Sequence, residues 1–300
     1  PAHYNTLNDV IFPFRIKLYK KMKTESYLSL NTQGYHKVVY QQWGESDNPR
    51  VIICVHGLAR NSRDFDDIAR VLSKHYRVIC PDIVGRGESD WLPPGSPYAI
   101  PQYVQDMVAL IARLNVTSVD WIGTSMGGLI GMAMAAYPDS PIKRLVLNDI
   151  GAFISQDALQ RIGDYVGLDE RFDSIESIET NLRKRYLAYK GLSDSQWKHI
   201  ALYGHRKTED GDFALHYDPV IGEYAKQAGG QDIDLWPLWQ LISCPQLLLW
   251  GEQSDVLKQD TVNRMQQSNP DLELISYPGI GHAPSLMEPD QIQSVIDWLK

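Results

Sequence analysis

The sequence predicts an α/β fold in which a mainly parallel sheet is covered by helices on both faces. Apolar runs of strand length alternate with segments of helical periodicity along most of the chain. Several of these runs, such as Val51–Val55, are continuously apolar, as expected of strands buried on both faces. Glycine-rich or polar loops follow the strands, and ligands bind beyond the carboxyl ends of the strands in such sheets.

The first half of the chain contains five expected strands. Glycine and proline punctuate them, and segments with one apolar helical face lie between them. The expected strands cover residues 36–43, 51–55, 76–83, 119–122 and 144–147. A glycine-rich turn at residues 85–90 follows the third strand; it lacks the spacing of a dinucleotide site, and we expect it to brace the sheet edge.

The fourth strand leads into Gly123-Thr124-Ser125-Met126-Gly127, a Gly-x-Ser-x-Gly pattern. A run of small and apolar residues follows, so the order is strand, tight turn, helix, with the helix ending near Pro138. Such a turn strains the backbone of the serine and exposes its hydroxyl at the top of the sheet. Serine is a weak nucleophile by itself, so a base and an orienting acid must lie elsewhere in the chain.

The alternation of strands and helices stops between about residues 152 and 234. Helical patterns cover residues 158–166, 175–189, 193–203 and 221–228, without clear buried strands. We interpret residues 152–234 as a helical cap inserted in a core made of residues 31–151 and 235–300, with residues 1–30 as an N-terminal arm. The basic, partly apolar segment at residues 11–23 of this arm could lie on a membrane surface, but Pro13 and the acidic chain favour packing on the domain.

The regular pattern returns with strands at residues 245–250 and 272–277 and a final helix with an apolar face. The loop after the first of these strands contains Asp255, and the loop after the second contains His282. Ser125, Asp255 and His282 therefore share one edge of the predicted sheet. Their chain order is the one expected of an α/β-hydrolase triad.

Five motifs follow one another along the chain: His56-Gly57, Asp82 with Gly85-x-Gly87-x-Ser89, Gly123-x-Ser125-x-Gly127, Gly251-x-x-x-Asp255 and Gly281-His282. With these motifs, residues 38–300 resemble the α/β-hydrolase superfamily, in particular its capped serine esterases and carbon–carbon-bond hydrolases. The resemblance implies that Ser125 attacks an acyl carbonyl, that His282 carries the proton, and that Asp255 orients the imidazole. It also implies an oxyanion hole formed by the backbone N–H groups of Met126 and Leu58.

Two other acidic residues compete with Asp255 as the third member of the triad. Asp149 also ends a strand on the same edge, and some relatives place the acid there. We interpret it as a cap or hinge residue where the chain enters the insertion, and prefer Asp255 because its Gly-x-x-x-Asp setting matches the commoner family arrangement. Glu252 lies too early in its loop.

The expected function is the hydrolysis of carboxylic esters of small or medium substrates through an acyl-enzyme. A serine at the tight turn after the fourth strand argues against haloalkane dehalogenases and epoxide hydrolases, which use aspartate at this position. The loop after His56-Gly57 contains fewer glycines and prolines than in carbon–carbon-bond hydrolases, which favours a carboxylesterase. A carbon–carbon-bond hydrolase acting on meta-cleavage-type products, and a non-catalytic binder of small ligands, remain the alternatives.

Composition limits the partners and the location. The net charge of −8 argues against nucleic acid, and no apolar run reaches the length of a membrane span. Three cysteines, an odd count, all fall in apolar stretches, so we expect reduced, structural thiols and a cytoplasmic protein; they are not spaced as metal ligands. The expected mechanism needs no metal and no cofactor. The expected partner is a small ester substrate.

Overall fold

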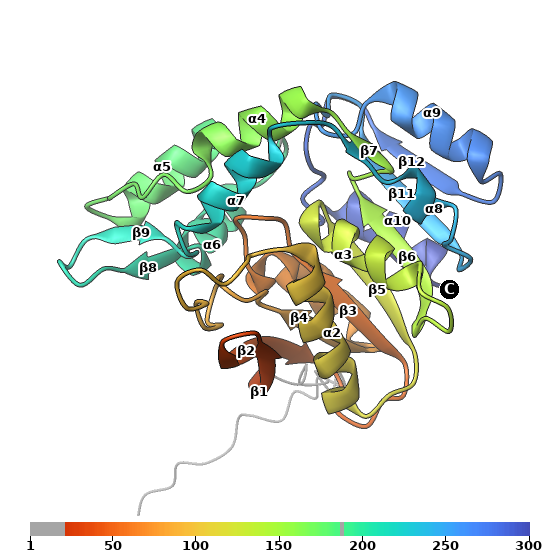
Figure 1. The fold of residues 1–300 in the computed structure, drawn as a ribbon, viewed down its shortest axis with the longest axis horizontal. Coiled ribbons are helices and arrows are strands. Elements are labelled where there is room, and N and C mark those ends of the chain that lie inside the picture. The colour runs from red at the N-terminus through yellow and green to blue at the C-terminus, as the bar shows by residue number, and fades with distance from the viewer. Residues whose placement is uncertain (1–21, 187–188) are drawn as a thin grey trace, which may run out of the picture.

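The computed structural model describes residues 22–186 and 189–300. An eight-stranded sheet forms its centre (Figure 1). The strands are β1 (Lys23–Asn31), β2 (Gly34–Trp43), β3 (Val51–Val55), β4 (Arg77–Pro81), β5 (Val119–Thr124), β6 (Ile142–Asn148), β11 (Gln246–Gly251) and β12 (Glu273–Tyr277). Their order is β1-β2-β4-β3-β5-β6-β11-β12. β2 is antiparallel to β1 and β4, and the remaining pairs are parallel, which confirms the predicted mainly parallel sheet.

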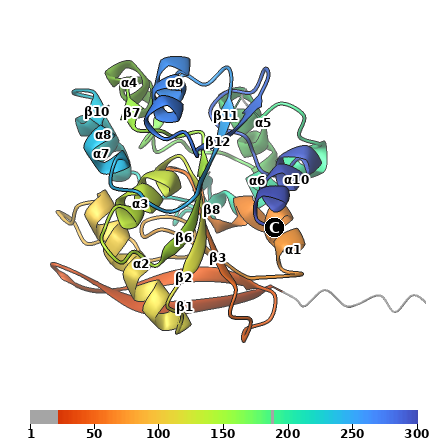
Figure 2. The same cartoon turned by 90° about the vertical axis from the view of Figure 1, so that its right-hand side faces the viewer.

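Helices cover both faces of the sheet (Figure 2). On one face lie α1 (Asp66–Leu72), preceded by the 3₁₀ turn η1 (Ser62–Phe65), and α10 (Pro289–Trp298). On the other lie α2 (Ile100–Leu114), α3 (Met126–Ala135), α8 (Trp236–Trp239) and α9 (Gln259–Ser268). The sequence of β3 is continuously apolar because both faces of this strand are buried: Ile53 packs in one core and Ile52 in the other.

The insertion between β6 and α8 lies over the edge formed by the carboxyl ends of the parallel strands (Figure 1). Its helices are α4 (Gln156–Tyr165), α5 (Ile175–Arg185), α6 (Asp194–Tyr203) and α7 (Ile221–Ala228), close to the four helical patterns. It also contains four short strands that the sequence did not predict: β7 (Phe153–Ile154), β8 (His205–Lys207), β9 (Phe213–Leu215) and β10 (Ile233–Asp234). β7 pairs with β10, and β8 with β9; strands of two or three residues are too short to show a periodicity.

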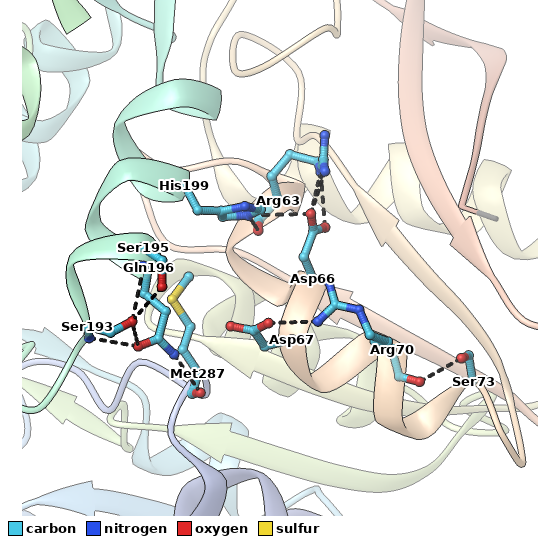
Figure 3. Close-up of polar contacts among 10 residues, drawn as sticks. All are labelled: Arg63, Asp66, Asp67, Arg70, Ser73, Ser193, Ser195, Gln196, His199 and Met287. Carbon is cyan, nitrogen blue, oxygen red and sulfur yellow. Dashed lines mark hydrogen bonds and ion pairs between the residues drawn. The ribbon is translucent and has the colours of Figure 1, made fainter. Parts of the chain in front are cut away.

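Helix α6 fastens this cap to the core (Figure 3). The Nε2 of His199 donates to the carbonyl oxygen of Arg63, at 3.0 Å, in η1. The Nε2 of Gln196 donates to the carbonyl oxygen of Met287, at 2.9 Å, in the loop before α10. The Arg63 guanidinium also stacks 3.6 Å from the centre of the Tyr203 ring. One end of the cap is therefore held by directional polar contacts.

The N-terminal segment is only partly described. Residues 23–30, which the sequence assigned to an arm, belong to β1 of the central sheet. Most of the basic segment at residues 11–23 lies outside the described residues. Among the described helices, none has the length and apolar character needed to cross a membrane. The three cysteines are free, and Cys54 and Cys80 are buried in β3 and β4.

Candidate active site

Ser125 lies at the turn between β5 and α3, in the strained geometry that the motif predicts. Its φ is 52° and its ψ is −115°, a conformation that residues with a side chain rarely adopt. A Cβ at Gly123 would lie 2.3 Å from the carbonyl carbon of Gly127, and one at Gly127 would lie 2.0 Å from the carbonyl oxygen of Val55. Both glycines are therefore required by close backbone approach, and together they allow the sharp turn that presents the serine.

A chain of hydrogen bonds connects Ser125, His282 and Asp149. The Oγ of Ser125 is 2.9 Å from Nε2 of His282, and Nδ1 of the same ring is 2.7 Å from Oδ2 of Asp149. Asp149 is fully buried at the end of β6. Its Oδ1 accepts from the Gly251 N–H at 2.8 Å, and its Oδ2 accepts from the Ser254 hydroxyl at 2.5 Å. These donors fix the carboxylate against the imidazole.

The prediction that Asp255 is the acidic partner of His282 is wrong. Its side chain is 48% exposed, and its carboxylate forms an ion pair with Arg161 of α4. The loop after β11 turns so that Ser254 and the N–H of Gly251 face Asp149, while Asp255 faces the cap. β6 lies next to β5 in the sheet, so the loop after β6 brings Asp149 close to the elbow. Asp149 was named as the competing residue, but its expected role as a cap or hinge residue does not fit this contact.

The two backbone groups expected to form an oxyanion hole lie beside Ser125. Met126 is the first residue of α3, and the N–H of a first helical residue has no acceptor within its helix. Leu58 follows Gly57, where an added Cβ would lie 3.7 Å from Cβ of Ser125. Both Leu58 and Met126 line a cavity together with Ser125. This placement is compatible with the predicted oxyanion hole, which remains a prediction.

Two chambers meet at Ser125, between the core and the cap. The larger, of about 490 Å³, is apolar, and we call it the apolar chamber; its lining includes Met126, Leu129, Ile154, Leu159, Ile221 and Ile233. The smaller, of about 90 Å³, we call the polar chamber; its lining includes Arg60, Asp64, Arg161, Tyr165, Arg185 and His282. Ser125, Leu58 and Ile162 line both. The cap thus supplies side chains of opposite character on the two sides of the serine.

A family model described as alpha/beta hydrolase fold matches residues 50–289 of the chain. The chain belongs to the α/β-hydrolase family. It is a hydrolase of that fold, as its sequence motifs led us to expect.

This α/β hydrolase has relatives that align along most of its length. It is 41% identical over 271 residues to the 3-hydroxybutyrate-oligomer hydrolase of Cupriavidus necator, covering 88% of this chain and 92% of that protein. It is 25% identical over 248 residues to the 2-(acetamidomethylene)succinate hydrolase of Mesorhizobium japonicum, covering 82% and 86%. The crystal structure of an alpha/beta hydrolase from Novosphingobium aromaticivorans superposes with a TM-score of 0.83 at 35% identity, covering 93% of this chain and 98% of that one.

His56 holds the loop that carries Leu58. Its Nδ1 donates to the carbonyl oxygen of Gly57 at 2.7 Å, and its Nε2 accepts from the N–H of Ile83 at 3.0 Å. Burial lowers the pKa of His56 to about 3, so the ring is neutral and can accept at Nε2. Both ring nitrogens of His56 are therefore engaged with the backbone, so His56 shapes this loop and is not placed to act as a base toward Ser125.

Arg86 is a site residue that the sequence did not reveal. It is fully buried, and its Nε donates to the carbonyl oxygen of Leu58 at 2.8 Å. Its Nη1 donates to the Tyr103 hydroxyl at 2.9 Å, and its Nη2 lies 3.5 Å from Sδ of Met126. The guanidinium thus contacts both residues of the expected oxyanion hole. An arginine between two glycines in a turn gives no sequence signal that it points inward.

Proposed function

We propose that this α/β hydrolase cleaves carboxylic esters with Ser125 as nucleophile, His282 as proton carrier and Asp149 as orienting acid. The observation that supports this most strongly is the hydrogen-bonded chain Ser125–His282–Asp149 at the junction of the two chambers. The identity of the acid is the main change from the sequence-based prediction.

The mechanism follows from the positions of these atoms. Ser125 Oγ attacks the acyl carbon while Nε2 of His282 accepts its proton, and Asp149 stabilises the imidazolium through Nδ1. The N–H groups of Met126 and Leu58 would stabilise the oxyanion, and losing one such donor costs on the order of a hundredfold in rate. His282 then protonates the leaving alcohol, and a water molecule opens the acyl-enzyme by the reverse steps. This sequence of steps involves no metal or cofactor.

The proposed substrates are esters of short hydroxy acids, including oligomers of 3-hydroxybutyrate. The curated relative at 41% identity carries that substrate in its name. The apolar chamber next to Ser125 could hold an acyl group of several carbons. We place the enzyme in the cytoplasm as part of this proposal, a location that its free thiols favour.

The test is the hydrolysis of p-nitrophenyl acetate, butyrate, octanoate and palmitate by the wild type and by Ser125→Ala. We expect turnover of the short and medium esters, and loss of turnover in the variant while its circular dichroism spectrum is unchanged. Folded wild-type protein that turns over none of these esters would contradict ester hydrolysis. Cleavage of a carbon–carbon bond in a vinylogous diketone would then be the next activity to assay.

A further inference from the structure

The two chambers differ in chemistry as well as in size. The apolar chamber measures about 490 Å³ and is bordered mainly by aliphatic side chains of α3, α4 and α7. The polar chamber measures about 90 Å³, and its lining contains three arginines, one aspartate and three tyrosines beside apolar residues such as Phe65 and Val166. A substrate that spans Ser125 therefore meets a hydrocarbon surface on one side and cations on the other.

The position of His282 determines which part of an ester enters each chamber. The leaving oxygen must receive its proton from Nε2 of His282, so the alcohol part of the substrate lies on the His282 side. His282 lines the polar chamber, whereas the lining of the apolar chamber includes Ser125 without His282. The alcohol part therefore points into the polar chamber, and the acyl part occupies the apolar chamber.

The cations of the polar chamber come from both the core and the cap. Arg60 is compensated within the chamber, because Asp64 accepts from its Nε at 2.8 Å and also lines the cavity. Arg161 and Arg185 flank one ring, with guanidinium carbons 5.8 Å and 5.4 Å from the centre of Tyr165. Their ion-pair partners, Asp255 and Glu170, are not part of the chamber lining. These ion pairs largely balance the charge, but each uses only some of the five N–H donors of its guanidinium, so Arg161 and Arg185 can offer further donors to the chamber.

We propose that Arg161 and Arg185 bind the free carboxylate of a hydroxy-acid leaving group, so that the enzyme removes the carboxyl-terminal unit of a short oligoester. This inference rests on the proposed ester hydrolysis and adds the end of the substrate at which cleavage occurs. Arginine binds carboxylates through charge-assisted hydrogen bonds, and both guanidinium groups lie near the same Tyr165 ring.

The reaction then proceeds from one end of the chain. Ser125 Oγ bonds to the carbonyl carbon of the penultimate unit, and the bond from that carbon to the oxygen of the terminal unit breaks. His282 gives its proton to that oxygen, so the terminal unit leaves as a free hydroxy acid. The remaining acyl chain stays in the apolar chamber until water releases it with a new carboxylate. The small volume of the polar chamber favours one unit over several.

The experiment uses the linear trimer of 3-hydroxybutyrate with ¹³C in its carboxyl-terminal unit, and the same trimer capped as a neutral carboxamide. We expect labelled 3-hydroxybutyrate as the first product by NMR. We also expect kcat/KM for the free acid to exceed that for the carboxamide by about ten- to a hundredfold, mainly through KM, because the cap removes charge-assisted hydrogen bonds. Equal rates, or a first product from the hydroxyl end or from the middle, would overturn the proposal.

Variants connect this preference to the two arginines. Arg185→Gln and Arg161→Gln should each lower, at least about tenfold, the ratio of kcat/KM for the acid to kcat/KM for the carboxamide. Arg183→Gln, on the same helix as Arg185 but paired with Glu179 and Asp194, is the matched control and should leave the preference intact. Asp255→Asn removes the carboxylate that pairs with Arg161 but keeps the charge of Arg161. The preference for the free acid should therefore remain in this variant.

The possible failures are distinguishable. If p-nitrophenyl butyrate is hydrolysed but the arginine variants keep the full preference for the acid, the carboxylate site is refuted and ester hydrolysis stands. The same conclusion follows if p-nitrophenyl butyrate is hydrolysed and the trimer is not. If no ester is hydrolysed, the proposed function fails, and the inference fails with it.

Discussion

The acidic partner of His282 is decided by contacts of single atoms. Asp149 receives hydrogen bonds from a backbone N–H, from the Ser254 hydroxyl and from the imidazole, all inside a fully buried pocket. Asp255 lies one residue after Ser254, but its carboxylate points to Arg161 at the surface. Neighbouring residues of this loop therefore differ in role, because Ser254 supports the Asp149 carboxylate while Asp255 forms an exposed ion pair.

We expect Asp149→Asn to lower kcat for p-nitrophenyl butyrate by about 10⁴-fold, because an amide in this position favours the wrong imidazole tautomer. Asp255→Asn is the control, and its kcat should stay within about threefold, since exposed ion pairs contribute little. Steady-state kinetics of both variants provides the measurement. A large loss in Asp255→Asn together with an active Asp149→Asn would restore the original assignment.

Arg86 supports the loop that carries Leu58, a residue of the proposed oxyanion hole. Its Nε donates to the carbonyl oxygen of Leu58, and its Nη2 contacts Met126, while the side chain itself is fully buried. It touches no reacting atom, so its effect on the reaction acts through Leu58 and Met126.

We expect Arg86→Met, which keeps an unbranched side chain but removes its donors, to lower kcat by about ten- to a hundredfold with little change in KM. The loss is smaller than that of a whole oxyanion donor because Leu58 would be displaced and not removed. Titration of the reactive serine with a fluorophosphonate corrects for inactive protein. An unchanged kcat per titrated site would show that Arg86 serves stability alone.

At the level of elements, α6 attaches the cap and α4 closes the site. Helix α6 begins with a capping box formed by Ser193 and Gln196, and the same Gln196 reaches the core at Met287 (Figure 3). Helix α4 lines both chambers, and its Arg161 meets the core through an exposed ion pair. The contacts of α6 with the core are partly buried, whereas the ion pair of α4 is exposed. Helix α6 is therefore the better candidate for the fixed attachment of the cap.

We expect the double variant Gln196→Ala and His199→Ala to weaken the attachment of α6 to the core by about 1–3 kcal/mol, from two lost hydrogen bonds. Hydrogen exchange of the α6 amides should accelerate accordingly, while that of β5 and β6 stays unchanged. Ser195→Ala is the control, because the Ser195 side chain bonds only within the N-terminal turn at Ser193. Equal α6 protection in the double variant and the wild type would disprove this anchoring.

At the level of the whole molecule, buried titratable groups make stability depend on pH. His56 has a folded-state pKa of about 3, below its ordinary value of 6.5, because of burial. The unfolded chain therefore binds more protons at this residue between these values, so its contribution to stability is present above pH 6.5 and is lost as the pH falls. Burial raises the pKa of Asp82 from 3.8 to about 6. Between these pH values the contribution of Asp82 to stability therefore changes with pH in the opposite direction to that of His56.

We expect His56 to remove about 2 kcal/mol from the free energy of unfolding between pH 7 and pH 5. Urea denaturation at several pH values measures the dependence in the wild type and in His56→Gln, which cannot titrate. The difference between the two proteins isolates His56 from Asp82. Parallel curves for the two proteins would show that the His56 ring does not titrate as its burial requires.

Most of the fold could be predicted from the sequence because it depends on local patterns. Continuous apolar runs marked the buried strands, and the helices of the insertion appeared at their expected places because each has a periodic apolar face. Ser125 and His282 could be identified because each stands in a glycine-containing motif directly after a strand. The first strand, β1, was assigned to an arm because its alternation is inverted: Leu28 and Leu30 are exposed, whereas Ser29 and Asn31 are buried.

Spatial adjacency decided the rest. Choosing between Asp149 and Asp255 required the path of the loop after β11, which depends on contacts between residues more than a hundred positions apart in sequence. The inward orientation of the Arg86 side chain and the difference in polarity between the two chambers likewise depend on how the cap and the core pack together. Short-range periodicity and motif spacing thus determined the strands, the tight turn at Ser125 and two residues of the proposed triad. Long-range packing, which has no period along the chain, decided the acid and the surfaces that a substrate meets.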